Sequence, residues 1–201
     1  KNNYQFSGEM PDILIPDKFP SDTDLQKALD NEELVLYYQP MVQSETGKLT
    51  SMEALVRWRH PERGLISPAE FIPKVEQSGL ILTLAEWVLR TVCNQYSFWQ
   101  KACFDPGGIA LNLSGRLFKL EVFIQTVSGV LEGTDFQPDC LEMEISQTII
   151  MQDEKTVFSG LKKLKEIGIR LTIDDFGSGF SSLSYLKKLP LDRIKIDRSL
   201  V

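Results

Sequence analysis

The chain has 201 residues, of which 42% are hydrophobic and 25% charged, a composition typical of a globular protein and not of a disordered one. Its formal net charge of -6 argues against a protein that binds DNA broadly through the phosphate backbone. The one histidine, His60, excludes multi-histidine zinc sites and HExxH proteases, so acid–base or metal chemistry falls to Asp, Glu, Asn and Lys.

The predicted elements begin after a stretch that contains three prolines and no helical period, residues 1–20, where we expect a linker. Helices are predicted over residues 22–33, 83–101, 120–131, 154–167 and 182–189. A further helix is expected to start at Ser67-Pro68-Ala69-Glu70, which reads as a capping box with proline at the first helical position. Strands are predicted over residues 34–39, 49–58, 109–114, 141–146, 170–174 and 193–197.

The spacing of these elements predicts the sheet topology. The first two strands are joined by a short connection containing Thr46-Gly47, so we expect them to pair antiparallel. The later strands alternate with helices, which indicates parallel βαβ units in either a doubly wound sheet or a (β/α) barrel. No GxGxxG follows a strand, which disfavours a dinucleotide-binding Rossmann fold.

The strands themselves favour the barrel, because most of them alternate apolar and polar residues. A doubly wound sheet is covered on both faces, whereas a barrel has one inward face that can be polar at its carboxyl-terminal mouth. The polar residues expected there are Glu53, Asn112, Glu144, Asp174 and Lys195. Any one of them alone would ordinarily face solvent, and we expect this of Glu142.

The four carboxylates and amides of this group cannot share a small volume without a cation between them, and oxygen-only ligands favour Mg²⁺ or Mn²⁺ over zinc. Asp174 and Asp175 end a strand and run into Phe176-Gly177, where the chain can turn so that both carboxylates face one site. Adjacent aspartates can bridge two metals in the manner used for phosphoester cleavage. An ordinary Asx turn is the alternative for this pair.

The three cysteines lack CxxC spacing, and the chain has no apolar stretch of 18 residues. We therefore expect a reducing, cytoplasmic location, or the cytoplasmic part of a membrane-attached sensor protein, with no membrane insertion by this segment.

An ordered set of motifs from about residue 23 to the end of the chain resembles the EAL domain, a cyclic di-GMP phosphodiesterase. The motifs are Tyr38-Gln39-Pro40, Glu53-Ala54-Leu55-Val56-Arg57-Trp58, Asn112-Leu113-Ser114, Glu142-Met143-Glu144-Ile145, Asp174-Asp175-Phe176-Gly177 and Lys195-Ile196-Asp197. The resemblance implies a TIM-like (β/α) barrel with an antiparallel first strand. It also implies an EAL domain over residues 21–201 that lacks its last two strands. Residues 1–6 resemble the end of a GGDEF domain, which suggests a GGDEF–EAL protein.

The resemblance also implies roles for individual residues. Glu53, Asn112, Glu144 and Asp174 would hold one metal ion, and Asp174 with Asp175 a second. Lys195, with Glu53, would be catalytic beside the attacking water, and the product would be linear pGpG. Substrate contacts would come from Gln39, Leu55, Arg57 and Asp197. The loop over residues 176–183 would couple metal binding to a homodimer contact, and Ca²⁺ would bind yet inhibit.

One residue departs from the family pattern. Gln147 stands where the family usually has a glutamate that steadies the Asp174-Asp175 loop, and glutamine carries no charge. Three functions therefore remain open: a metal-dependent phosphodiesterase, a degenerate domain that binds cyclic di-GMP as a sensor, and a pure interaction domain.

Overall fold

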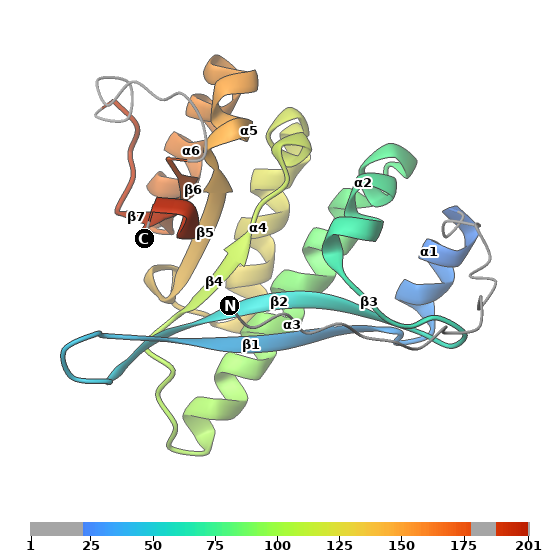
Figure 1. Cartoon of the computed structure of the whole chain (residues 1–201), viewed down its shortest axis with the longest axis horizontal. Helices are drawn as coiled ribbons and strands as arrows, with labels where there is room; N and C mark the ends of the chain where they lie inside the picture. The colour runs from blue at the N-terminus through green and yellow to red at the C-terminus, as the bar shows by residue number, and fades with distance from the viewer. Residues whose placement is uncertain (1–21, 178–187, 201) are drawn as a thin grey trace, which may run out of the picture.

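The computed structural model describes residues 22–177 and 188–200 (Figure 1). The expected linker, residues 182–187 of the expected sixth helix and the greater part of the 176–183 loop lie outside the described residues. The helices are α1 (Asp22–Asp30), α2 (Pro68–Ser78), α3 (Ile81–Lys101), α4 (Glu121–Thr134), α5 (Gln147–Gln152) and α6 (Glu154–Ile167). The strands are β1 (Leu34–Val42), β2 (Leu49–His60), β3 (Gly64–Ile66), β4 (Ile109–Asn112), β5 (Leu141–Ser146), β6 (Arg170–Phe176) and β7 (Arg193–Ile196).

The strands form one sheet in the order β1-β2-β4-β5-β6-β7, with β3 paired to β2. The β1–β2 pair is antiparallel, and every later pair along this order is parallel. Within the described part of the chain, β1 and β7 are the ends of this order, so the sheet is a partial barrel that does not close. The predicted TIM-like architecture and its antiparallel first strand are confirmed.

The apolar face of the sheet is covered by the helices, which follow one another in chain order from α1 to α6 (Figure 1). The alternating residues Leu141, Met143 and Ile145 of β5 are all 0% exposed, as the period-two pattern predicts for a face that packs against helices. At the other end of the sheet, Trp58 of β2 lies edge-on to Phe71 of α2, with ring centroids 5.8 Å apart. This packing leaves the opposite, polar face of the strands for the site.

Two short elements, β3 and α5, were not expected from the sequence, because three and six residues are too few for a clear period. Helix α5 follows β5 directly, and Ser146 caps it by accepting a hydrogen bond from the Ile149 N–H at 3.4 Å. Helix α2 starts at Pro68 as predicted. The Ser67 hydroxyl contacts the Glu70 carboxylate at 3.5 Å instead of capping the backbone, so the expected capping box is not formed.

Asp192, which directly precedes strand β7, contacts both α6 and β6. Its carboxylate accepts from the Lys165 ammonium of α6 at 2.6 Å and from the Leu171 N–H of β6 at 2.8 Å, while its own N–H donates to the Leu171 carbonyl at 2.8 Å. Burial raises the pKa of Asp192, but these hydrogen bonds outweigh burial and leave the pKa below its ordinary value.

None of the helices in the described ranges is both long and apolar enough to span a bilayer.

We predict that Asp192→Asn lowers the free energy of unfolding at pH 7 by about 1 kcal/mol or less, because the ion pair is largely exposed. A carboxyl with a lowered folded pKa stabilises above its unfolded pKa and loses that contribution as pH falls through the folded value. The difference between the two proteins should therefore shrink below about pH 4. Urea unfolding at a series of pH values measures it, with exposed Asp139→Asn as the control. A difference independent of pH would contradict the assignment.

Candidate active site

Five side chains from five different strands meet on the polar face of the sheet, near the carboxyl ends of its parallel strands. They are Glu53 of β2, Asn112 of β4, Glu144 of β5, Asp174 of β6 and Lys195 of β7. The strand register pairs Asn112 with Glu144 but staggers the other members, since Asp174 pairs with Ser146 and Glu53 pairs with Ala110. We call this group the acidic cluster.

The Lys195 ammonium lies at the centre of the acidic cluster. Its Nζ is 2.7 Å from Glu144 Oε2, 3.0 Å from Glu53 Oε2 and 3.8 Å from Asp174 Oδ1. Asn112 joins the group by donating from Nδ2 to Glu53 Oε1 at 2.8 Å. The sequence-based expectation that these residues converge is therefore met by the geometry.

Glu144 is the most buried member of the cluster, at 1% exposed. Burial raises its pKa to about 7, and the carboxylates of Glu53 and Asp174 act in the same direction, whereas Lys195 lowers it. Burial lowers the pKa of Lys195, but hydrogen bonds and attraction from Glu144 and Glu53 outweigh it and raise the pKa above its ordinary value. Lys195 is accordingly a fixed positive charge among several carboxylates.

The turn after Asp174 directs a second carboxylate to the same rim. Asp175 adopts a left-handed backbone with φ of 53°, and its N–H donates to Asp174 Oδ1 at 2.9 Å. Burial raises the pKa of Asp175, and the carboxylates of Asp174 and Asp197 raise it further. Two negative groups thus stand side by side where the β6 strand ends.

The side chain of Gln147 holds this turn through a hydrogen bond to its backbone. Its side chain is buried at 4% exposed, and its Oε1 accepts a hydrogen bond from the Gly177 N–H at 3.1 Å. Gly177 has φ of 99°, a conformation that favours glycine. An uncharged amide therefore makes the backbone contact at the position where the family pattern has glutamate.

The residues expected to bind substrate lie along the margins of the acidic cluster. Gln39 of β1 is the register partner of Glu53, and Leu55 and Arg57 follow Glu53 at alternate positions of β2, where Leu55 also lines the apolar cavity between the sheet and the helices. Asp197 follows Lys195, and its N–H donates to the Phe176 carbonyl at 3.1 Å. The Arg57 guanidinium donates to the Val56 carbonyl at 2.7 Å and forms no ion pair with any described carboxylate.

The prediction that Glu142 faces solvent is wrong. It is 4% exposed, and its carboxylate accepts from Thr172 Oγ1 at 2.5 Å and from Arg193 Nη1 at 2.8 Å. The signal was present in the strand pattern, because Glu142 shares the polar face of β5 with Glu144. Nothing in the sequence alone pairs it with Arg193, which is 51 residues away.

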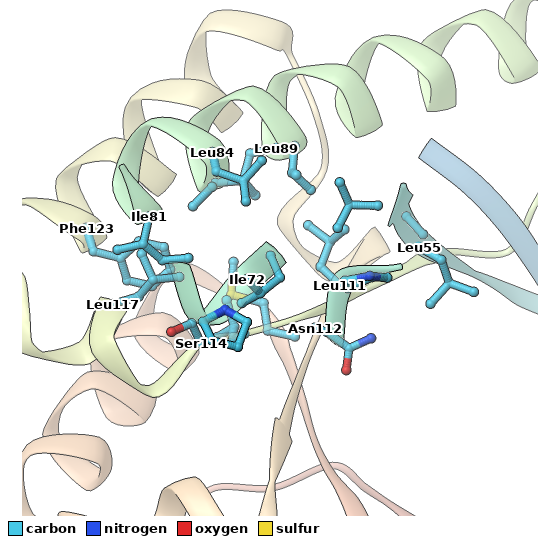
Figure 2. Close-up of a pocket in the computed structure, with 18 of the residues that line it drawn as sticks. Leu55, Ile72, Ile81, Leu84, Leu89, Leu111, Asn112, Ser114, Leu117 and Phe123 are labelled. Atoms are coloured by element: carbon cyan, nitrogen blue, oxygen red, sulfur yellow. The ribbon is translucent and has the colours of Figure 1, made fainter. Parts of the chain in front are cut away.

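A cavity of about 400 Å³ lies behind β2 and β4, between the sheet and helices α2 and α3. Figure 2 shows Leu84 and Leu89 over this space and the Asn112 amide turned away from the apolar side chains. None of the described residues that line it carries a charge, so the cavity does not suit phosphate groups. The polar face of the strands remains the candidate site.

The described residues include no set of three or more His, Cys, Asp or Glu side chains already arranged to hold a metal ion. Instead, the carboxylates are spread around Lys195. The donor chemistry nevertheless fits a hard divalent cation, since three carboxylates and one amide face a single ammonium. Glu144 Oε1 is also buried without a hydrogen-bond partner among the described groups, and a cation would satisfy it.

The fold and the site together define a TIM-like partial barrel with acidic residues and a lysine at the carboxyl-terminal rim. The sequence matches the EAL domain family over residues 22–201, and the chain belongs to that family. The resemblance drawn from the motifs is therefore confirmed.

Named relatives give the family its context. The chain is 39% identical over 201 residues to the bifunctional diguanylate cyclase/cyclic di-GMP phosphodiesterase MucR of Pseudomonas aeruginosa, covering all of this chain and 29% of MucR. It is 37% identical over 183 residues to the cyclic di-GMP phosphodiesterase PdeR of Escherichia coli, covering 90% of this chain and 27% of PdeR.

A solved structure, the PaMucR phosphodiesterase in complex with c-di-GMP, superposes with a TM-score of 0.83 at 40% identity, covering 88% of this chain and 72% of that one. The chain thus spans about a quarter of the length of the curated relatives that it matches.

We predict that Gln147→Met, which keeps volume but removes the acceptor, speeds amide hydrogen exchange at Gly177 by about fivefold, because one hydrogen bond contributes roughly 1 kcal/mol. Gln147→Glu keeps an acceptor and should preserve protection. Exchange followed by NMR or mass spectrometry tests both, with exposed Gln125→Met as the control. Equal exchange in all variants would show that Gln147 does not hold the turn.

Proposed function

We propose that this domain hydrolyses cyclic di-GMP to linear pGpG in bacterial second-messenger signalling. The observation that supports the proposal most directly is the acidic cluster, in which residues from four strands gather around Lys195 of a fifth strand at the rim of the barrel. The names of the relatives MucR and PdeR and the cyclic di-GMP complex of the MucR phosphodiesterase agree with this substrate.

The residues present suit a two-metal site for Mg²⁺ or Mn²⁺. Glu53, Asn112, Glu144 and Asp174 would hold one ion, and Asp174 with Asp175 the other. When bound, the metal supplies activation of a water nucleophile and neutralisation of phosphate charge.

The chain's own side chains contribute fixed charge and orientation. Lys195 is held by Glu53 and Glu144, so its ammonium can stabilise the negative charge that develops on the phosphate without first reorganising. The Arg57 guanidinium, unpaired with any described carboxylate, is suited to bind a substrate phosphate. Gln39, Leu55 and Asp197 would contact the rest of the nucleotide.

The reaction consumes one water molecule. A water oxygen bonds to phosphorus, the bond from phosphorus to the 3′ oxygen breaks, and a proton ends on that leaving oxygen. The product is the linear dinucleotide with a 5′ phosphate. Glu53 contacts both Lys195 and Asn112, and in this proposal its carboxylate orients the water and accepts its proton.

We extend the proposal to the cellular setting. The description of MucR as a bifunctional cyclase and phosphodiesterase supports a GGDEF domain upstream in the same polypeptide. We propose a cytoplasmic location for this domain, a homodimer through the EAL fold, and no DNA partner, in keeping with the net charge of -6.

A second function, binding of cyclic di-GMP as a sensor without hydrolysis, is favoured by one observation. Gln147 replaces the family's loop glutamate, so the Asp174-Asp175 turn rests on a neutral amide.

We predict that the full-length domain converts cyclic di-GMP to pGpG with Mg²⁺ or Mn²⁺, whereas the 201-residue chain by itself hydrolyses it poorly or not at all. In the full-length domain, Glu53→Ala should lower kcat by roughly a hundredfold or more, because it removes a metal ligand and a partner of Lys195. Chromatography of the nucleotides gives the readout, and exposed Glu132→Ala is the matched control. If the protein binds cyclic di-GMP but forms no product over hours, the enzymatic function is contradicted and the sensor function is supported. If it does not bind cyclic di-GMP, only the function as an interaction domain is left.

We also predict that Ca²⁺ supports binding of cyclic di-GMP but not turnover, because its larger and looser coordination shell misplaces the water relative to Mg²⁺. Isothermal titration with Ca²⁺, compared with product formation at the same ion concentration, measures both effects. Turnover with Ca²⁺ at the rate seen with Mg²⁺ would contradict the two-metal arrangement.

A further inference from the structure

A second polar layer lies directly beneath the acidic cluster. Glu142, Thr172 and Arg193 stand two residues before Glu144, Asp174 and Lys195 on β5, β6 and β7, respectively. Because side chains alternate along a strand, residues two apart share a face. Inward side chains of a barrel are mostly apolar, so a polar lower layer requires an explanation.

The lower layer is a connected set of hydrogen bonds across the three strands. Glu142 Oε1 accepts from Thr172 Oγ1 at 2.5 Å and from Arg193 Nη1 at 3.2 Å, and Glu142 Oε2 accepts from the same Nη1 at 2.8 Å. The Glu142 side chain is 5% exposed, whereas that of Arg193 is 42% exposed. Removing Arg193 would therefore leave a buried carboxylate with only a hydroxyl partner.

The backbone does not hold Lys195 in a regular ladder. Strand β7 pairs regularly at Arg193 with Thr172 and at Ile194 with Ile173, and pairing resumes only at Ile196 with Phe176. Lys195 lies within this irregular stretch, opposite Asp174 and Asp175. The extra residue lies on β6, the strand that such an irregularity bends. Lys195 therefore has no regular ladder partner, and the regular pairs nearest before it on β7 are those of Arg193 and Ile194.

We propose that Glu142 and Arg193 are positioning residues that direct Lys195 onto Glu144 and Glu53. The ion pair fixes β7 against β5 one layer below the cluster, so that the Lys195 Nζ arrives 2.7 Å from Glu144 and 3.0 Å from Glu53. This inference rests on the proposed hydrolysis for its kinetic consequence, but the placement of Lys195 can be measured without catalysis.

The kinetic test compares Arg193→Ala with Arg193→Lys and with Arg90→Ala, a control that also loses an arginine–glutamate pair, the exposed one with Glu86. We expect Arg193→Ala to lower kcat for cyclic di-GMP by about 10- to 100-fold, as for other residues that orient catalytic groups, with KM changed less than about threefold. Arg193→Lys should recover most of kcat, because a single nitrogen makes both contacts to Glu142.

The second test needs no turnover. The rate at which an N-hydroxysuccinimide ester acetylates Lys195 is quantified by mass spectrometry. It should rise about threefold or more in Arg193→Ala, because the contacts of Lys195 with Glu144 and Glu53 weaken when the Glu142–Arg193 contact is lost. It should stay unchanged in Arg90→Ala. Should Arg193→Ala not fold, Glu142→Leu combined with Arg193→Met replaces the ion pair by apolar groups and still removes the contact.

A variant that is less stable but keeps both kcat and Lys195 reactivity would overturn the proposal and leave the pair a purely structural one. If the unaltered protein forms no product, the proposed function fails, and the acetylation comparison alone decides whether the pair positions Lys195.

Discussion

The constraint on which this structure depends is the cost of gathering like charges at one place. Glu53, Glu144 and Asp174 come from three strands, and each would repel the others in a partly desolvated space. The Lys195 ammonium, within 4 Å of all three, offsets that repulsion. Such a group persists only where the surrounding sheet holds its members rigidly. A divalent cation bound at this site could take over part of the contact that the carboxylates make with Lys195.

The sheet provides that rigidity through its two faces. Outward residues such as Met143 and Ile145 are buried against helices, which fixes the twist and spacing of the strands. Inward residues are then free to be polar, since the helices already supply the apolar burial. The interior is layered, with the Glu142–Arg193 pair below and the acidic cluster above. Each of the strands β5, β6 and β7 therefore contributes one side chain to the supporting layer and, two residues later, one side chain to the acidic cluster.

The turn after β6 shows how the chain adapts to a missing charge. The amide of Gln147 accepts the Gly177 N–H although it carries no charge. The turn beside Asp174 and Asp175 is therefore held by a neutral hydrogen bond, in a region where burial and neighbouring carboxylates already raise the pKa of Asp175.

The sequence by itself determined most of the elements, the antiparallel first pair and the residues that converge, because strand alternation and short connections are local properties. The sequence also contains the family motifs. The strands β4, β5 and β6, which carry several of these motifs, begin and end close to their predicted bounds. Only the tertiary structure decided that Glu142 is buried against Arg193, that Lys195 sits among the carboxylates, and that Gln147 reaches Gly177. Each of these contacts joins residues at least 30 positions apart, and the free energy that selects them comes from packing the whole sheet. The residue pattern within one strand predicts the face on which a side chain lies, but it does not predict the residue of another strand that the side chain contacts.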